Sequence, residues 1–203
     1  MLTLGSLVAL AAFAFVSAVT PGPNNLMLMA SGTNFGFART GPHMSGVILG
    51  FALMVLLVGL GLGAIFVAVP GAMLGLKIVS VAYLLYLAWR IATAEPPRLG
   101  EVDSGGKPLT FWQAVAFQWV NPKGWTMALT AATVYVPAEN RVLGAGIVAL
   151  VFLAVNVPSA TVWAAAGVQL RRLLHRPNAY RAFNIVAALL LVASLYPVLV
   201  PEG

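Results

Sequence analysis

Two short segments of this sequence are suited to bind a small polar molecule inside a membrane, because each places prolines and amides within a long apolar stretch. Proline lacks a backbone N–H and clashes with the preceding helical turn, so it leaves backbone carbonyls without partners. In hydrocarbon, unwound backbone is tolerated only where it is buried in protein or lines a cavity. The first and second proline segments read Thr20-Pro21-Gly22-Pro23-Asn24-Asn25 and Asn121-Pro122-Lys123-Gly124.

The first proline segment has the residues of a carboxylate site. Gly22 allows close approach of a ligand to the backbone, and Pro23 is suited to begin a new half-helix. The N-terminus of a helix presents free N–H groups and the positive end of a dipole, to which a carboxylate binds. We therefore expect an amino-acid carboxylate near Asn24, Asn25 and Lys123.

The second proline segment has the residues of an ammonium site. Asn121 and the carbonyls freed by Pro122 are acceptors, and together with the carbonyl of Thr20 they are expected to bind a substrate ammonium. Lys123 is the one charged side chain deep in a predicted span, and intramembrane charge is costly enough to suggest a function. Gln118 lies three residues before Asn121 and hence on the same helix face.

Structural interpretations of the same residues stay open. Proline and glycine are frequent in membrane helices as kinks, and Asn24 or Asn25 could simply cap a half-helix. Lys123 could extend its charge to a membrane interface. Because the two segments match in position, we predict a binding site. Its predicted substrate-binding residues are Thr20, Pro21, Gly22, Pro23, Asn24, Asn25, Gln118, Asn121, Pro122 and Lys123.

The composition is that of an integral membrane protein without cofactors. Of 203 residues 61% are hydrophobic and only 8% are charged, against about 25% charged residues in soluble domains. Residues 1–203 are therefore expected to form a single transmembrane transporter domain. The sequence has no cysteine and only two histidines, so no metal site and no cofactor is expected.

Six apolar segments are long enough to cross a bilayer, which needs about 20 residues for a helix. The predicted fold is thus an all-α integral membrane bundle of six transmembrane helices, with the first and fourth helices broken at proline. The predicted spans are residues 4–30, 44–69, 72–89, 111–136, 142–167 and 182–200.

The basic residues predict the orientation of these spans. Eight of the eleven lysines and arginines fall in loops on one side, which the positive-inside rule places in the cytoplasm, with both termini outside. The net charge of +6 is therefore attributed to topology, and no nucleic-acid partner is expected. The cytoplasmic residues are Arg39, Arg90, Arg98, Lys107, Arg171, Arg172, Arg176 and Arg181.

A polar linker at residues 93–110 divides the chain into repeat one, about 1–92, and repeat two, about 111–203. Each half holds three predicted spans, and because three is odd the two repeats must be inverted relative to each other. The proline segments occupy corresponding places in the halves, which is the best sequence indication of a transporter's binding site.

The acidic residues all lie outside the predicted spans, so no span carries the carboxylate that proton-driven carriers commonly use. Proton coupling would have to involve Lys123, His43, the substrate's own groups or bound water. Facilitated or voltage-assisted movement is the alternative. The five acidic residues are Glu95, Glu101, Asp103, Glu139 and Glu202.

Two further patterns concern how the helices pack and bend. Several glycines predict close helix packing, because small residues let membrane helices approach closely. A run in the fifth span predicts a mild structural kink. The glycines are Gly46, Gly50, Gly59, Gly61 and Gly63, and the run is Asn156-Val157-Pro158-Ser159.

The chain resembles the LysE/RhtB family of bacterial amino-acid exporters. The resemblance spans essentially the whole chain and implies an inner-membrane carrier that expels amino acids or their derivatives, driven by the proton motive force. Residues 34–37, 88–92 and 117–120 are similar to the cysteine and O-acetylserine exporter branch. The motifs that carry the resemblance are Pro21-Gly22-Pro23-Asn24, Asn121-Pro122-Lys123 and residues 82–89.

The predicted function is export of a small amino acid by alternating access. Its predicted partners are the amino-acid substrate and the lipid bilayer, and the sequence leaves a homo-oligomer open. One alternative is a passive channel, facilitator or structural membrane subunit. An intramembrane enzyme would need a nucleophile beside a base; His43 and His175 lie toward the cytoplasm, and Ser159 has no evident base partner.

Overall fold

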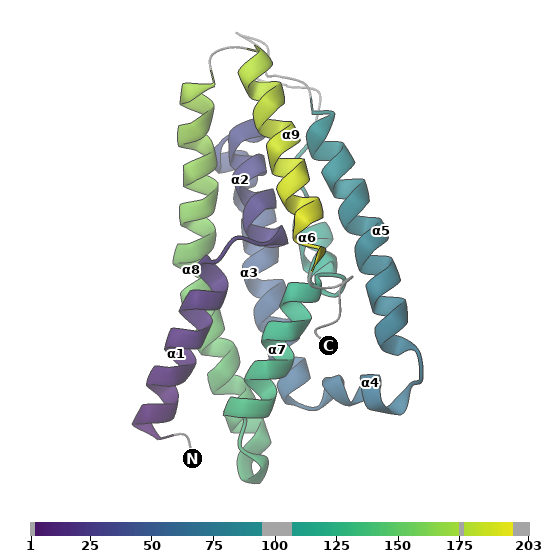
Figure 1. Cartoon of the computed structure of the whole chain (residues 1–203). Helices are drawn as coiled ribbons and strands as arrows, with labels where there is room; N and C mark the ends of the chain where they lie inside the picture. The colour runs from purple at the N-terminus through teal and green to yellow at the C-terminus, as the bar shows by residue number, and fades with distance from the viewer. Residues whose placement is uncertain (1–2, 95–106, 175–176, 197–203) are drawn as a thin grey trace.

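The computed structural model describes residues 3–94, 107–174 and 177–196, and within these ranges all regular structure is helical (Figure 1). The predicted all-α class is therefore confirmed. The α-helices are α1 (Leu4–Val19), α2 (Pro23–Phe35), α3 (Phe37–Gly59), α4 (Ile65–Ala68), α5 (Ala72–Ala92), α6 (Phe111–Gln118), α7 (Pro122–Tyr135), α8 (Arg141–Leu173) and α9 (Pro177–Ala193). Two short 3₁₀ helices are η1 (Leu62–Ala64) and η2 (Ala138–Asn140).

Local sequence accounts for where several helices begin. Pro23 and Pro122 occupy the first positions of α2 and α7, where the missing N–H is harmless and the fixed φ suits a helix. Thr110 forms a capping box with Gln113 at the start of α6, in which each side chain bonds the other's backbone. The positions of the two prolines thus define the starts of the two helices that follow the proline segments.

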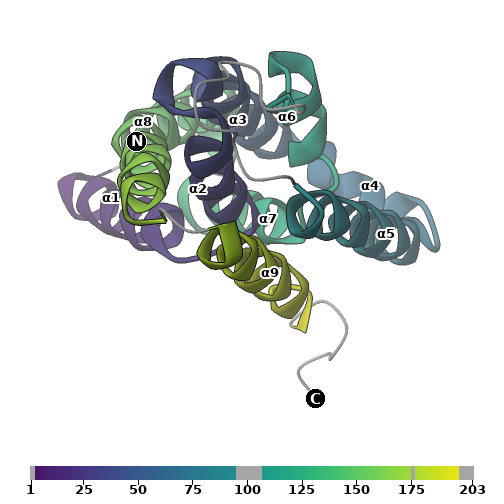
Figure 2. The same ribbon diagram turned by 90° about the horizontal axis from the view of Figure 1, so that it is seen from above.

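The helices that flank the proline segments have opposite vertical order in the two halves of the chain. In Figure 1, α1 lies below α2, whereas α6 lies above α7. α1 and α2 are bent by 50° relative to each other. Seen from above, α2 lies among α3, α8 and α9, and it packs against all three (Figure 2). α1 and α6 end, and α2 and α7 begin, near the middle of the bundle (Figure 1).

Three buried apolar clusters within the described ranges hold the bundle together. Phe51 of α3 and Phe152 of α8 pack edge to face with ring centroids 5.5 Å apart, and Leu10 of α1 joins this cluster. A separate cluster on the other side joins α2, α5 and α9 through residues such as Leu84 and Leu191. A third cluster joins α2, α3, α6 and α8. In a bilayer such contacts act through close packing, because lipid tails are as apolar as the side chains.

Glycines bring α3 close to α6 and α8, as predicted for three of the five glycines. A Cβ on Gly50 would lie 2.9 Å from the Val115 Cα, and one on Gly59 would lie 2.8 Å from the Ala145 Cβ. A Cβ on Gly46 would lie 2.7 Å from the Ala114 Cβ. These three packing predictions are confirmed.

The other two glycines lie after α3. Gly61 has a φ of 121°, a left-handed conformation that ends α3 in a turn, so its role is conformational rather than close packing. Gly63 faces α7, where an added Cβ would lie 2.7 Å from the Leu129 Cδ2.

An equally close contact between α2 and α8 was not predicted. A Cβ on Gly32 would collide with the backbone carbonyl of Ala164, and one on Gly167 would collide with the carbonyl of Met29. The Thr33 hydroxyl donates to the Gly167 carbonyl across this contact at 2.9 Å. Glycine spacing alone does not reveal which helices pair, so the sequence carried no specific signal for this interface.

The observed helices differ in length from several predicted spans. α3 begins seven residues before the predicted start at 44, and the predicted end of that span is instead the turn with η1 and α4, which lies across the bundle (Figure 1). α8 continues through Pro158 without interruption. The last predicted span overlaps α9, and its residues 197–200 lie outside the described ranges.

Three helical segments in the described ranges are long and apolar enough to cross a membrane, and the bent pair α1 and α2 adds a fourth when taken as one span. This finding supports a membrane protein with several apolar helices. The count of six spans and the two-repeat arrangement remain predictions. The three segments are Phe37–Gly59, Ala72–Ala92 and Ala138–Arg172.

Gly32→Ala is expected to destabilise the protein, because the added methyl group meets backbone of α8 that cannot rotate away. Overpacking of this kind costs about 1–3 kcal/mol. Gly146→Ala is the matched control, since no atom lies within 4 Å of its added Cβ and both changes raise helix propensity equally. The thermal unfolding midpoint in detergent should fall for the first variant only. Equal midpoints would show that α2 and α8 can separate freely.

Candidate functional site

The two proline segments lie against one pocket near the middle of the bundle, which we call the central pocket. Gly22, Asn24 and Asn25 line it from the first segment, and Asn121 and Lys123 line it from the second. These five residues were all predicted to bind substrate. The lining also includes Ser17, Ala18, Phe51, Gly124, Met127 and Asn156.

The end of α1 presents backbone carbonyls that its own helix does not satisfy. Pro21 and Pro23 have no N–H to donate to the preceding turn. The Asn25 amide of α2 reaches back and donates to the carbonyl of Ala18 at 2.7 Å and to that of Thr20 at 2.9 Å. Asn25 therefore holds the end of α1 rather than capping α2, whose N-cap has no side-chain hydrogen bond.

Lys123 connects the second proline segment directly to the first. Its ammonium donates to the carbonyl and the hydroxyl of Thr20, each at 2.9 Å, and to the carbonyl of Pro21 at 3.4 Å. The lysine stem lies against Gly22, where an added Cβ would be 2.7 Å from the Lys123 Cδ. Glycine at position 22 thus leaves the room that the lysine needs to reach these oxygens.

A third helix also binds the end of α1. The Ser159 hydroxyl of α8 donates to the Ala18 carbonyl at 2.8 Å, beside the Asn25 amide. The carbonyls at the end of α1 are consequently bound by side chains from α2, α7 and α8. Ser159 has a structural role here, as its place in a predicted kink suggested, although α8 does not break.

Asn24 and Gln118 pair side by side between α2 and α6. The Asn24 amide donates to the Gln118 Oε1 at 2.9 Å, and the Gln118 amide donates back to the Asn24 Oδ1 at 3.2 Å. Gln118 also donates to the carbonyl of Ala114 and is fully buried. Gln118 does not itself line the central pocket; it contacts Asn24, which does.

Asn121 offers an acceptor that the protein does not use. Its side chain is 2% exposed, and its Oδ1 has no hydrogen-bond partner in the ranges that the structure describes. A buried polar atom without a partner costs about 1–3 kcal/mol. At the wall of the central pocket this oxygen is suited to accept an N–H or O–H from a ligand.

The remaining predicted site residues lie near the pocket without lining it. Thr20 and Pro21 contribute through the carbonyls that Lys123 binds. Pro23 and Pro122 start their helices and contribute no side-chain hydrogen bond. Asn156 is a pocket residue that the sequence indicated only as part of a structural kink, and its amide donates to the Phe152 carbonyl of its own helix.

Helix ends give the central pocket both signs of partial charge. α2 and α7 begin beside it, and their first N–H groups have no partner within the helix. α1 ends there and contributes carbonyls with partial negative charge. These three helix ends together can bind a zwitterion, a molecule with one ammonium and one carboxylate.

The sequence matches a known protein family over most of its length. Residues 15–194 match the family model described as the LysE type translocator. The chain belongs to the LysE family. The predicted resemblance to this family is therefore confirmed, and the chain is a membrane transporter rather than an enzyme. No solved structure matches the chain.

Three relatives of this LysE family member are similar over nearly their whole length. They are named cysteine/O-acetylserine efflux protein and come from Escherichia coli strain K12, Escherichia coli O9:H4 strain HS and Shigella flexneri. Each is 34% identical over 181 residues, which cover 89% of this chain and 90% of the relative.

Asn25→Ala is expected to lower the thermal unfolding midpoint, because the buried carbonyl of Ala18 and the partly buried carbonyl of Thr20 each lose a donor. The expected loss is about 2 kcal/mol of unfolding free energy. Asn140→Ala serves as a control, since Asn140 caps α8 at an exposed position through a long 3.4 Å bond. That change should cost only about 0.5 kcal/mol. A midpoint for the Asn25 variant at or above that of the control would contradict the anchoring role.

Proposed function

We propose that this LysE family translocator exports a small neutral amino acid across the bacterial inner membrane by alternating access, with the central pocket as its binding site. The observation that carries the proposal is the meeting of the two proline segments at one pocket, where the Lys123 ammonium lies on the Thr20 carbonyl. A substrate ammonium has the same chemistry as that of Lys123 and suits the same oxygens.

The proposed binding reaction is an exchange of ammonium groups. The substrate ammonium takes the carbonyls of Thr20 and Pro21 from Lys123, and the Asn121 Oδ1 accepts one of its N–H groups. Lys123 then turns to the substrate carboxylate, which also lies near Asn24 and the N-terminus of α2. Every charged group thereby has hydrogen-bond partners before and after binding.

Coupling to the proton motive force is proposed to involve Lys123. It is the one acidic or basic side chain among the residues that line the central pocket. The only acidic residue within the described ranges is Glu139, which lies in η2 outside the pocket. Lys123 would carry the proton as its ammonium group. That ammonium would leave the carbonyls to which it donates when the central pocket switches the side of the membrane to which it opens.

The proposed topology has six spans in two inverted repeats, about 1–92 and 111–203, with the linker in the cytoplasm and both termini outside. The opposite vertical order of α1–α2 and α6–α7 supports an inverted relation (Figure 1). Arg90 and Arg171 lie in the last turns of α5 and α8, at the end proposed to face the cytoplasm.

Cysteine and O-acetylserine are the proposed first substrates to test, because the similar relatives are named for them. Proteoliposomes loaded with these two and with a panel of other amino acids should show saturable efflux that falls when a protonophore is added. Efflux that rises linearly with substrate concentration and does not change when the protonophore is added would instead identify a channel. Absence of efflux for every amino acid would overturn the proposed function.

Lys123→Met is expected to reduce efflux at least about tenfold, since it removes the group proposed to pair with the carboxylate. Lys77→Met is the control, because it removes a lysine of α5 that does not line the central pocket. Initial efflux rates are compared at equal reconstituted protein. Equal rates for the two variants would exclude Lys123 from the site.

A further inference from the structure

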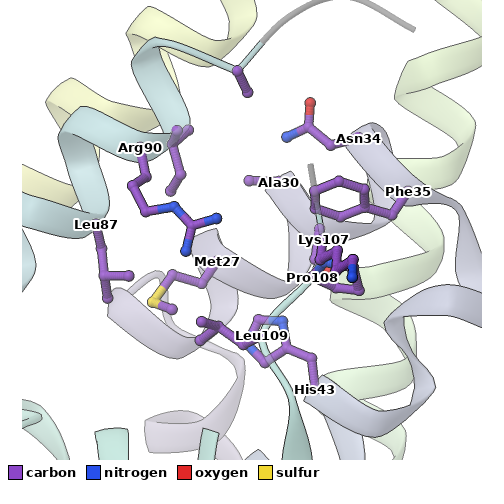
Figure 3. Close-up of a pocket in the computed structure, with 13 residues that line it drawn as sticks. Met27, Ala30, Asn34, Phe35, His43, Leu87, Arg90, Lys107, Pro108 and Leu109 are labelled. Atoms are coloured by element: carbon purple, nitrogen blue, oxygen red, sulfur yellow. The ribbon is translucent and has the colours of Figure 1, made fainter. Parts of the chain in front are cut away.

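A second pocket lies toward the end of the bundle proposed to face the cytoplasm, and we call it the inner pocket. It is formed by α2, α3, the end of α5 and the segment that leads into α6 (Figure 3). Its space, including its open mouth, is about 490 Å³, within the usual range for small-molecule sites. The proposed transport reaction in the central pocket does not use any of its residues.

Two cationic side chains line the inner pocket. Arg90 belongs to the last turn of α5, and its guanidinium points into the pocket in Figure 3. Lys107 lines the pocket from the segment before α6. A guanidinium binds a carboxylate through two parallel hydrogen bonds, and a nearby ammonium adds a third.

His43 gives this pocket a buried polar group without a partner. Its side chain is 2% exposed, and neither ring nitrogen has a hydrogen-bond partner in the ranges that the structure describes. Figure 3 shows the ring beside Leu109 at the base of the pocket. Buried polar groups in proteins are nearly always hydrogen-bonded. A ligand in the inner pocket would supply the missing partner.

The other walls suit the rest of a small amino acid. Met27, Leu87 and Leu109 form an apolar side beside the two cations. Ser31 and Asn34 add uncharged polar groups; Ser31 shares a hydrogen bond with Thr40, and Asn34 accepts one from the Tyr180 hydroxyl. The pocket therefore joins a carboxylate-binding side to an apolar side.

One face of α2 connects the inner pocket to the central pocket. Asn24, Met27, Ser31 and Asn34 recur at helical spacing and so lie along the same face. Asn24 lines the central pocket, whereas the other three line the inner pocket. Asn24 and Asn34 are ten positions apart, which is about 15 Å along the helix. A ligand could move from one pocket to the other along this face once the Asn24–Gln118 pair opens.

We propose that the inner pocket is a loading site that binds the carboxylate of the amino acid before it enters the central pocket. This proposal rests on the proposed export function. Arg90 and Lys107 hold the carboxylate, His43 donates a hydrogen bond from its ring N–H, and the apolar wall receives the side chain.

The chain contains no cysteine, so single-cysteine reporters can be placed in each pocket. Ile91→Cys reports on the inner pocket and Met127→Cys on the central pocket. The measurement is the rate at which a small methanethiosulfonate reagent labels each thiol in nanodiscs. O-acetylserine should slow labelling at both positions. The amine 2-aminoethyl acetate, which lacks only the carboxylate, should not slow labelling at Ile91→Cys.

Charge removal tests the two cations. The double change Arg90→Gln and Lys107→Gln should raise the O-acetylserine concentration that half-protects Ile91→Cys at least about tenfold. The matched control, Arg172→Gln with Arg181→Gln, removes two exposed charges that do not line the pocket and should leave that concentration unchanged. Equal protection in both double variants would overturn the loading site.

Two further measurements distinguish an amino-acid loading site from a lipid site and from the central pocket. If phosphatidylglycerol in the nanodisc slows labelling of Ile91→Cys by itself and O-acetylserine adds nothing, the inner pocket holds a lipid phosphate and the proposal is wrong. In the Lys123→Met background, O-acetylserine should still protect Ile91→Cys. Loss of that protection would show that the inner pocket does not bind O-acetylserine independently of the central pocket, and would overturn the proposal. Absence of efflux for all amino acids would instead overturn the export function itself.

Discussion

The structure depends on the need to satisfy backbone carbonyls at the end of α1 inside an apolar bundle. Pro21 and Pro23 cannot donate to the preceding turn, and in the absence of water each unpaired carbonyl is costly. The amide of Asn25, the ammonium of Lys123 and the hydroxyl of Ser159 supply the missing donors from three other helices. The same oxygens therefore hold the helices together and lie at or beside the central pocket, which Ala18 lines.

This arrangement gives the Lys123 ammonium partners although no carboxylate among the described residues lines the central pocket beside it. Three oxygens of Thr20 and Pro21 surround the Lys123 ammonium, so its charge is solvated by backbone and hydroxyl dipoles rather than by an ion pair. Dipole partners bind a cation without neutralising it. Such partners can exchange one ammonium for another more readily than a buried carboxylate could.

The sequence located part of the lining of the central pocket but few of the contacts between helices. Pro23 and Pro122 start α2 and α7 because proline has a fixed local meaning, and five of the ten predicted site residues line the central pocket. The glycine contact between Gly32 and Ala164 and the pairing of Asn24 with Gln118 could not be predicted, because each joins residues far apart in the chain. The lengths of α3 and α8 also differ from the predicted spans.

The sequence by itself determined the apolar, all-helical character, the family, and the starts of α2 and α7, since composition acts locally and proline suits the first position of a helix. Only the tertiary structure decided which freed carbonyl meets which donor. In the folded chain the Asn25 amide and the Lys123 ammonium both donate to the Thr20 carbonyl at the end of α1. It also left His43 and the Asn121 Oδ1 without partners among the described residues. Hydrogen bonds require atoms within about 3 Å, and only folding sets distances between remote parts of a chain.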